Sequence, residues 1–319
     1  MGRKVKWLMP ETYKNDYQYY RQWITEAWVR AGGSIYKHHY ISFTMRKVLG
    51  KFNFISSLVP NSIKSHDALV VLCGAHPNYS AWPLMYTHEL IPIIWDCWPK
   101  YHSTILKSIK HNKIKTVFCT SSQTRDLIKD KLPGTNVYWL PEGIDVNAYS
   151  KGALLKDRKI DVLELGRQLQ ALHNSLVQHS THDKIKHLYS KPRELVFKDF
   201  SELTKGLADT KITVCYPRCD THPDMAGNIE TLTQRYWECM LSRTLIVGRA
   251  PKELKDFCGY NPVIELKDNP AEEICNLLEN IDAYQSLVDK NYAFALNNAS
   301  WDSRIPFIKD TLANLGYIL

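Results

Sequence analysis

Short apolar runs that alternate with helical segments are the feature that most limits what this chain can fold into. Residues 67–73 (DALVVLC), 91–95 (IPIIW) and 159–165 (KIDVLEL) are such runs. Near-continuous apolar runs of this length are typical of strands buried on both faces in parallel sheets, where helices make the connections. The pattern therefore predicts an α/β fold built on parallel sheets.

The alternation occurs twice, with a polar interruption at residues 141–158. The expected strands are residues 4–8, 67–73, 91–95, 115–119, 136–140, 159–165, 211–216, 244–248 and 262–266. The stretch between residues 168 and 200 is expected to be helical. A chain of 319 residues also agrees with two domains, at roughly 150 residues each. We therefore expect two doubly wound, Rossmann-like domains, residues 1–150 and residues 151–298.

The stretch from Cys215 to Gly248 has the pattern strand, polar loop, helix, strand. Thr231 and Gln234 fit a capping box, which predicts a helix that begins within residues 229–232. The first turn of a helix leaves N–H groups without partners at the positive end of the helix dipole. The loop before this helix is therefore a predicted anion site, and phosphate is the usual anion.

Two glutamates, Glu230 and Glu238, lie on this expected helix with Arg235 between them. Eight helical residues extend over about 12 Å, which is roughly the length of a nucleotide diphosphate sugar. One carboxylate could bind sugar hydroxyls and the other ribose hydroxyls. The alternative is that Glu230 is a solvated loop acid and Glu238 a helix acid paired with an arginine, since this spacing also occurs by chance.

Composition narrows the class of partner. The eight cysteines are dispersed, and several lie in strand-like runs, which is typical of free thiols in a reducing cytosol. No apolar run approaches the ~20 residues of a membrane span, and the N-terminus lacks the apolar core of a signal peptide. We therefore expect a cytoplasmic protein. The net charge of +8 favours anionic partners, but no nucleic-acid module is recognisable.

Several polar residues follow expected strands, where doubly wound sheets bind their ligands. In the first half these are His76 and Asp96, the acceptor-side candidates; the alternative for His76 is a turn residue. In the second half Gly166 and Arg167 follow residues 159–165. The basic and aromatic segment 36–54 is either a solvated helix or a surface that lies peripherally on an anionic membrane.

Four segments together resemble the GT-B glycosyltransferases, in their group-one, family-four-like branch. They are LPEGIDVNAY (140–149), VLELGR (162–167), the Glu230-x7-Glu238 motif followed by CMLSRTLIVG, and APKELKDFCGYNPVIEL (250–266). The resemblance implies two Rossmann-like domains that face each other across a cleft. It also implies that a C-terminal helix, residues 299–319, crosses back to the first domain.

The resemblance also implies roles for residues of this chain. Glu230 would contact the donor sugar and Glu238 the ribose, while Arg167 would bind the diphosphate. Gly166, Gly227, Asn228 and Thr231 would line the donor site, where the alternative for Gly227 and Asn228 is a plain turn. The family usually has a lysine where this chain has Leu172, so we expect Arg235 to neutralise the diphosphate instead.

These observations predict a glycosyltransferase that moves a hexose from a nucleotide diphosphate sugar to a saccharide or lipid-linked glycan, in polysaccharide or glycoconjugate synthesis. The resemblance implies retention of anomeric configuration, no metal and no cofactor. Two alternatives remain open: a nucleotide-sugar epimerase of the same fold, which would act without an acceptor, and a non-catalytic basic protein that binds nucleic acid or anionic surfaces.

Overall fold

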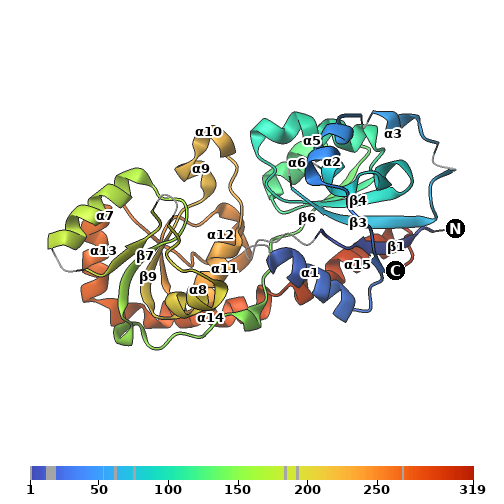
Figure 1. Ribbon diagram of the computed structural model, residues 1–319. Helices are drawn as coiled ribbons and strands as arrows, with labels where there is room; N and C mark the ends of the chain where they lie inside the picture. The colour runs from blue at the N-terminus through green and yellow to red at the C-terminus, as the bar shows by residue number, and fades with distance from the viewer. Residues whose placement is uncertain are drawn as a thin grey trace. The chain divides into compact units, whose positions relative to one another are not determined.

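The computed structural model describes residues 2–11, 19–52, 54–60, 63–74, 77–182, 185–191, 194–267 and 269–319. It divides into two compact units, each built on one sheet (Figure 1). The first unit comprises Met1–Pro141, Met225–Ile229 and Trp301–Leu319. The second comprises Glu142–Asp224 and Glu230–Ser300.

The first unit contains a six-stranded parallel sheet in the order β2-β1-β3-β4-β5-β6. Its strands are β1 (Lys4–Leu8), β2 (Ile35–Tyr36), β3 (Asp67–Cys73), β4 (Glu89–Ile94), β5 (Thr116–Cys119) and β6 (Asn136–Trp139). The central strand β3 is apolar along almost its whole length, and six of its seven residues are buried. That burial explains why its sequence does not alternate between polar and apolar residues.

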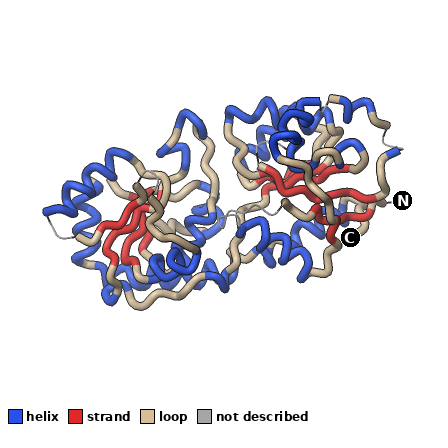
Figure 2. Tube along the Cα trace, in the orientation of Figure 1, coloured by secondary structure: helices blue, strands red, loops and turns tan. Residues whose placement is uncertain are grey.

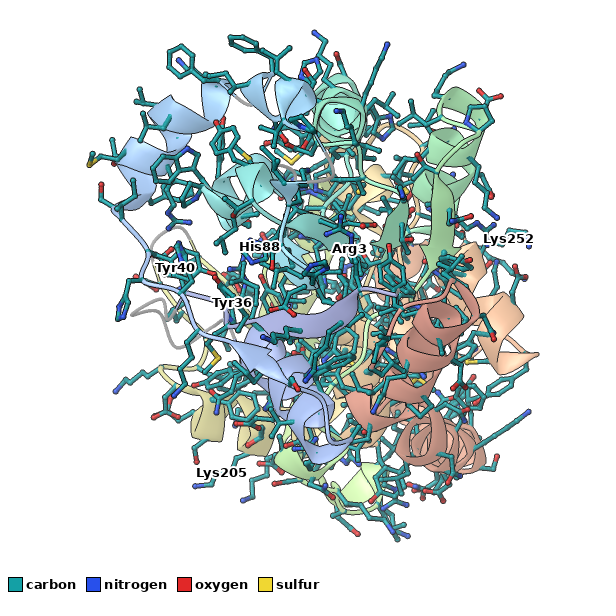
Figure 3. The ribbon with its side chains drawn as sticks, turned by 90° about the vertical axis from the view of Figure 1, so that its right-hand side faces the viewer. Arg3, Tyr36, Tyr40, His88, Lys205 and Lys252 are labelled. Carbon is teal, nitrogen blue, oxygen red and sulfur yellow. The ribbon has the colours of Figure 1, made fainter. Side chains whose placement is uncertain are left out.

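Helices flank this sheet (Figure 2). They are α1 (Tyr19–Arg30), α2 (Phe43–Leu49), α3 (Ile55–Leu58), α4 (Pro77–Ala81), α5 (His102–His111), α6 (Ser122–Lys131) and α15 (Ile305–Asn314). Serine caps set two of the starts, because Ser42 accepts a hydrogen bond from the N–H of Met45, and Ser121 accepts one from the N–H of Thr124. The ring of Tyr36, the last residue of β2, packs edge-on against that of His88, which precedes β4, with centroids 5.1 Å apart (Figure 3).

The last helix, α15, belongs to the first unit although it follows the whole of the second unit in sequence. The ring of Phe307 packs against those of Phe118 and Tyr138, both at 6.3 Å between centroids. Just before α15, Asp302 accepts two hydrogen bonds from Arg30 at 3.0 and 2.9 Å. These contacts attach the C-terminal segment to β5, β6 and the end of α1.

The second unit contains a five-stranded parallel sheet in the order β11-β10-β9-β7-β8. Its strands are β7 (Ile160–Glu164), β8 (His187–Tyr189), β9 (Thr210–Cys215), β10 (Leu245–Gly248) and β11 (Ile264–Glu265). Strand β7, the first of this sheet in sequence, lies between β8 and β9. The order therefore reverses between β7 and β9, which is the switch point where ligands bind in such sheets.

The remaining helices follow the strands of the second sheet or connect its elements. They are α7 (Gln170–His182), α8 (Phe200–Ala208), α9 (Arg218–Thr221), α10 (Pro223–Ala226), α11 (Gln234–Leu241), α12 (Lys252–Cys258), α13 (Pro270–Glu279) and α14 (Gln285–Asn298). Apolar residues of β7, β9 and β10 form one core with residues of α7 and α13. Leu172, at the position where the resembling family has a lysine, is a buried member of this core.

The predicted α/β class and its parallel sheets are confirmed. Two short strands were not expected. No strand was predicted at residues 35–36, where β2 lies. Strand β8 lies inside the stretch 168–200, which was expected to be helical. The residues of β8 (HLY) are all half-buried, and three residues are too few to produce a visible periodicity, so the sequence pattern did not reveal this strand.

Candidate functional site

Glu230 is held by two groups of the second unit, both from the segment that follows β10. Its Oε1 atom forms an ion pair with Arg249, the residue that follows β10. Its Oε2 atom accepts a hydrogen bond from the backbone N–H of Lys252, at 2.7 Å, where α12 begins. The Glu230 side chain retains 24% of its exposure, so the carboxylate is fixed in place while part of it faces solvent.

Arg249 also binds a second carboxylate, that of Asp220 in α9. Its Nε and Nη2 atoms each donate to Asp220 at 2.6 Å, which is the bidentate geometry that guanidinium and carboxylate favour. The hydrogen bonds and charges of Asp220 and Glu230 raise the pKa of Arg249. Asp220 follows β9 and Arg249 follows β10, so this cluster lies beyond the carboxyl ends of two adjacent strands.

The helix after Glu230 begins later than the capping box predicted. It starts at Gln234, and the residue before it, Thr233, makes no side-chain capping bond. Thr231 is buried, and the neighbouring N–H of Leu232 donates instead to Glu253 Oε2 at 2.9 Å. This distant acceptor fixes residues 230–233 in a non-helical conformation. The prediction that both glutamates lie on one helix is therefore wrong, and the helical span of about 12 Å does not apply.

Glu238 lies on α11 and is paired on both sides. Its Oε2 atom lies 2.6 Å from Arg235 Nη1, one turn earlier on the same helix. Its Oε1 atom accepts a hydrogen bond from the hydroxyl of Tyr149 at 3.1 Å. Burial raises the pKa of Tyr149, so this hydroxyl remains protonated and a donor throughout the ordinary pH range. The structure brings Arg235 to Glu238, whereas Glu230 is paired with Arg249.

Gly166 and Arg167 follow β7 at the switch point. Gly166 has φ of 77°, a conformation that favours glycine, and its N–H donates to Ser190 Oγ at 2.9 Å. Arg167 is exposed at the same edge of the sheet. Together with Asp220, Glu230 and Arg249, these residues place charged groups of both signs beyond the carboxyl ends of β7, β9 and β10.

The other candidates belong to the first unit. Asp96 is exposed, with φ of 53°, in the turn after β4. His76 lies outside the described residues. Gly227 and Asn228 fall in the segment 225–229 that groups with the first unit, where the carbonyl of Asn228 accepts a hydrogen bond from Gln123 Nε2 at 3.0 Å.

Sequence reasoning missed Arg249 and Asp220, although one signal was available. Arg249 follows an expected strand in the same way as Arg167, and the rule that ligands bind at carboxyl ends of strands would have selected both. The pairing of Asp220 with Arg249 was not available from the sequence, since 29 residues separate them.

The two parallel sheets with flanking helices form the fold of the GT-B glycosyltransferases. Sucrose-phosphate synthase from Thermosynechococcus elongatus is similar, with a TM-score of 0.62 and 12% identity over 98% of this chain and 99% of that one. HepE from Anabaena, solved with UDP and glucose, has a TM-score of 0.57 and 10% identity over 98% of this chain and 100% of that one.

TarM is similar over a smaller share of its length. It has a TM-score of 0.54 and 12% identity over 81% of this chain, and this chain covers 57% of TarM. At these identities the likeness establishes the fold. No family model matches the sequence, and no curated protein matches it. Within the described ranges, no helix is both long enough and apolar enough to cross a membrane.

Proposed function

We propose that this protein is a glycosyltransferase that moves a hexose from a nucleotide diphosphate sugar to a saccharide or lipid-linked glycan, with retention of anomeric configuration. The observation that carries the proposal is the cluster of Glu230, Arg249 and Asp220 beyond the carboxyl ends of β9 and β10. The GT-B fold supports the same reading, since the neighbours are glycosyltransferases.

In this proposal Glu230 faces the donor sugar. The anomeric carbon becomes positive as its bond to the diphosphate oxygen breaks, and a fixed carboxylate nearby lowers the energy of that charge. Arg249 and the N–H of Lys252 hold Glu230 in one position, so the carboxylate needs little reorganisation during the reaction. Arg167 is the cation proposed to meet the leaving diphosphate.

Glu238 and Arg235 act as one unit in this proposal. The Glu238 carboxylate accepts hydrogen bonds from the ribose hydroxyls, as acidic residues do in related nucleotide sites. Arg235 and Tyr149 fix the direction of that carboxylate. In this arrangement Arg235 positions Glu238 and is not the only group that neutralises the diphosphate.

A transfer that retains the anomeric configuration does not need a protein side chain as a dedicated base. The acceptor oxygen bonds to the anomeric carbon on the face that the diphosphate leaves. The departing phosphate oxygen then takes the proton of the acceptor hydroxyl. The donor therefore supplies its own base, and the reaction needs neither metal nor cofactor in this proposal.

A surface on the first unit supports a lipid-linked acceptor. Eight of the sixteen large hydrophobic side chains that are exposed on the described residues lie between residues 43 and 63. They are Phe43, Met45, Val48, Phe52, Phe54, Ile55, Leu58 and Ile63. Lys47 and Lys51 are exposed within the same segment. Apolar side chains interspersed with lysines suit the interface of an anionic membrane, and we propose peripheral contact there.

A panel of nucleotide sugars tests the transferase. The cognate donor at about a hundred times its dissociation constant should stabilise the protein by about 2.7 kcal/mol, which a thermal shift would detect. Glu238→Ala should lose the shift. Glu279→Ala, an exposed glutamate at the end of α13, should keep it. A flat response of the wild type to every nucleotide sugar would refute the proposal, and conversion of the sugar without an acceptor would indicate an epimerase.

A further inference from the structure

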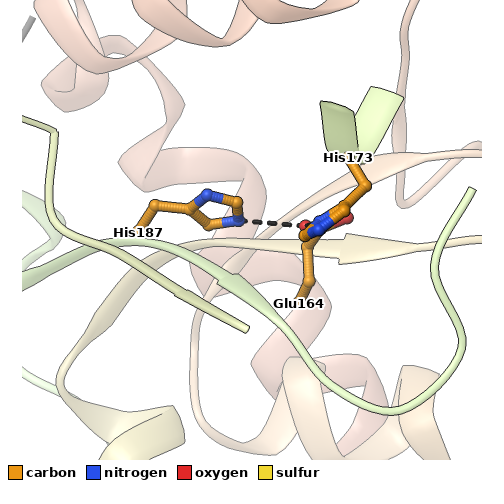
Figure 4. A group of neighbouring side chains, drawn as sticks. All are labelled: Glu164, His173 and His187. Atoms are coloured by element: carbon orange, nitrogen blue, oxygen red, sulfur yellow. Dashed lines mark hydrogen bonds and ion pairs between the residues drawn. The ribbon is translucent and has the colours of Figure 1, made fainter. Parts of the chain in front are cut away.

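Three side chains that the proposed transfer does not use converge in the second unit. Glu164 is the last residue of β7, His187 is the first residue of β8, and His173 lies on α7. Figure 4 shows the imidazoles of both histidines directed at the carboxylate of Glu164. In the parallel register Val162 is opposite His187, so Glu164 and His187 are two positions apart and share a face.

Both imidazoles meet the same carboxylate oxygen. His173 Nδ1 lies 2.6 Å from Glu164 Oε2, and His187 Nε2 lies 3.0 Å from that atom. One ligand atom from each of the three residues lies within 4.8 Å of the other two. The side chains of Glu164 and His187 are each 2% exposed and that of His173 is 13% exposed.

Hydrogen bonding leaves this buried cluster incompletely satisfied. Glu164 Oε1 and His187 Nδ1 are both buried and have no hydrogen-bond partner among the described residues. No lysine or arginine in the described ranges forms an ion pair with Glu164. A buried carboxylate with an orphaned oxygen is costly, and it is an unusual feature unless a further ligand completes it.

The geometry points to a divalent transition-metal site, and we propose that Glu164, His173 and His187 bind Zn²⁺. Two imidazole nitrogens and one carboxylate oxygen form a ligand set that zinc favours, whereas Mg²⁺ and Ca²⁺ prefer oxygen ligands throughout. With zinc–ligand bonds of about 2.0–2.1 Å, tetrahedral ligand atoms lie about 3.3 Å apart. The contact from His173 to Glu164, now 2.6 Å, would therefore lengthen by about 0.7 Å, and the contact from His187, now 3.0 Å, by about 0.3 Å.

The ring of Tyr189 packs against both imidazoles, with centroid distances of 4.8 Å to His173 and 4.9 Å to His187. It restricts the rotation of the two rings that would carry the metal. An ion there would link α7 to β7 and β8, and its proposed role is to stabilise the second unit independently of glycosyl transfer.

Metal titration of the whole 319-residue chain tests this site. After treatment with a chelator and dialysis, calorimetry with ZnCl₂ should give one tight site per chain, and zinc should raise the melting temperature. Glu164→Gln and His187→Ala should lose both effects. His179→Ala should retain them, because this histidine on α7 forms a hydrogen bond with the carbonyl of Ser175 and lies outside the cluster. Binding that persists unchanged in Glu164→Gln and His187→Ala would overturn the proposal.

X-ray absorption on the zinc-loaded wild type tests the ligands without any substitution, in case the variants do not fold. Two imidazoles with oxygen in the remaining positions are expected. Sulfur in the zinc shell would instead assign the metal to some of the eight free cysteines and refute the site. These readouts do not depend on glycosyl transfer, so the metal site and the proposed function can fail separately.

Discussion

Arg249 forms an ion pair with Glu230, 19 residues away in sequence, and binds Asp220 at the same time. The guanidinium thereby fixes the carboxylate on which the proposed chemistry depends. Arg249→Ala should lower kcat/KM about 100-fold, similar to the loss of a preorganised polar group in other active sites. Steady-state kinetics with the cognate donor measures this effect.

Arg249→Lys should recover only part of the activity, because an ammonium cannot bind Asp220 in a bidentate manner while it pairs with Glu230. Arg125→Ala is the matched control, since Arg125 pairs with its exposed neighbour Asp126 on α6. Near-normal kinetics of Arg249→Ala would show that Glu230 does not depend on this arginine.

Arg235 and Glu238 should behave as one unit toward the donor. We expect Arg235→Ala and Glu238→Ala each to weaken nucleotide binding, and the double variant to be little weaker than either single one. Residues in direct contact commonly show coupling energies of about 0.5–3 kcal/mol in such cycles. Calorimetric titration of the nucleotide into all four proteins measures the coupling. Additive losses would indicate that Arg235 contacts the diphosphate separately.

The alternation of strands and helices could be predicted because the inner strands β3, β4, β5 and β10 bury almost every residue. Strand β3 was predicted at its observed bounds for that reason. Local pattern failed where distant residues decide the structure. The capping box at Thr231 was a valid local signal, but buried Glu253 binds the N–H of Leu232 from 21 residues away. The pairing of Glu230 with Arg249 was equally hidden, since the two residues come together only through the order of the strands.

The apolar segment between residues 43 and 63 should bind anionic vesicles. Leu58 is 74% exposed, and its replacement by serine should weaken co-sedimentation with vesicles that contain phosphatidylglycerol. Leu195→Ser is the control, because Leu195 is 62% exposed in the second unit, outside this segment. Loss of one interfacial leucine should weaken partitioning several-fold, given roughly 25 cal/mol per Å² of apolar surface. The proposal would be refuted if the wild type sedimented equally well with vesicles of phosphatidylcholine alone. It would also be refuted if the Leu58→Ser and Leu195→Ser variants sedimented equally.

Alkaline pH should destabilise the protein through its buried thiols and phenols. Burial raises the pKa of Cys258 to about 12 and that of Tyr260 to about 12. A folded-state pKa above the unfolded value means that the folded protein holds its protons more tightly. The resulting stability is complete below about pH 9 and is lost as the pH rises through 12.

Differential scanning calorimetry between about pH 8 and pH 11 should therefore show a falling melting temperature. Cys258→Ala removes one of these groups and should make the decline shallower, whereas Lys156→Ala, an exposed lysine 55% accessible, should leave the slope nearly unchanged. A melting temperature that stays constant or rises over this range would contradict the assignment.

Gly166 should resist substitution because of its backbone and not because of crowding. Its φ of 77° is left-handed, yet an added Cβ would meet no atom within 4 Å. Gly166→Ala should therefore cost about 1–2 kcal/mol of unfolding free energy through backbone strain. It should also weaken donor binding, since the turn positions Arg167.

Gly134 has the same open surroundings without a left-handed φ, so Gly134→Ala should be neutral or stabilising. Urea unfolding of the two variants separates the effects, and equal stability of both would show that the turn after β7 tolerates a side chain.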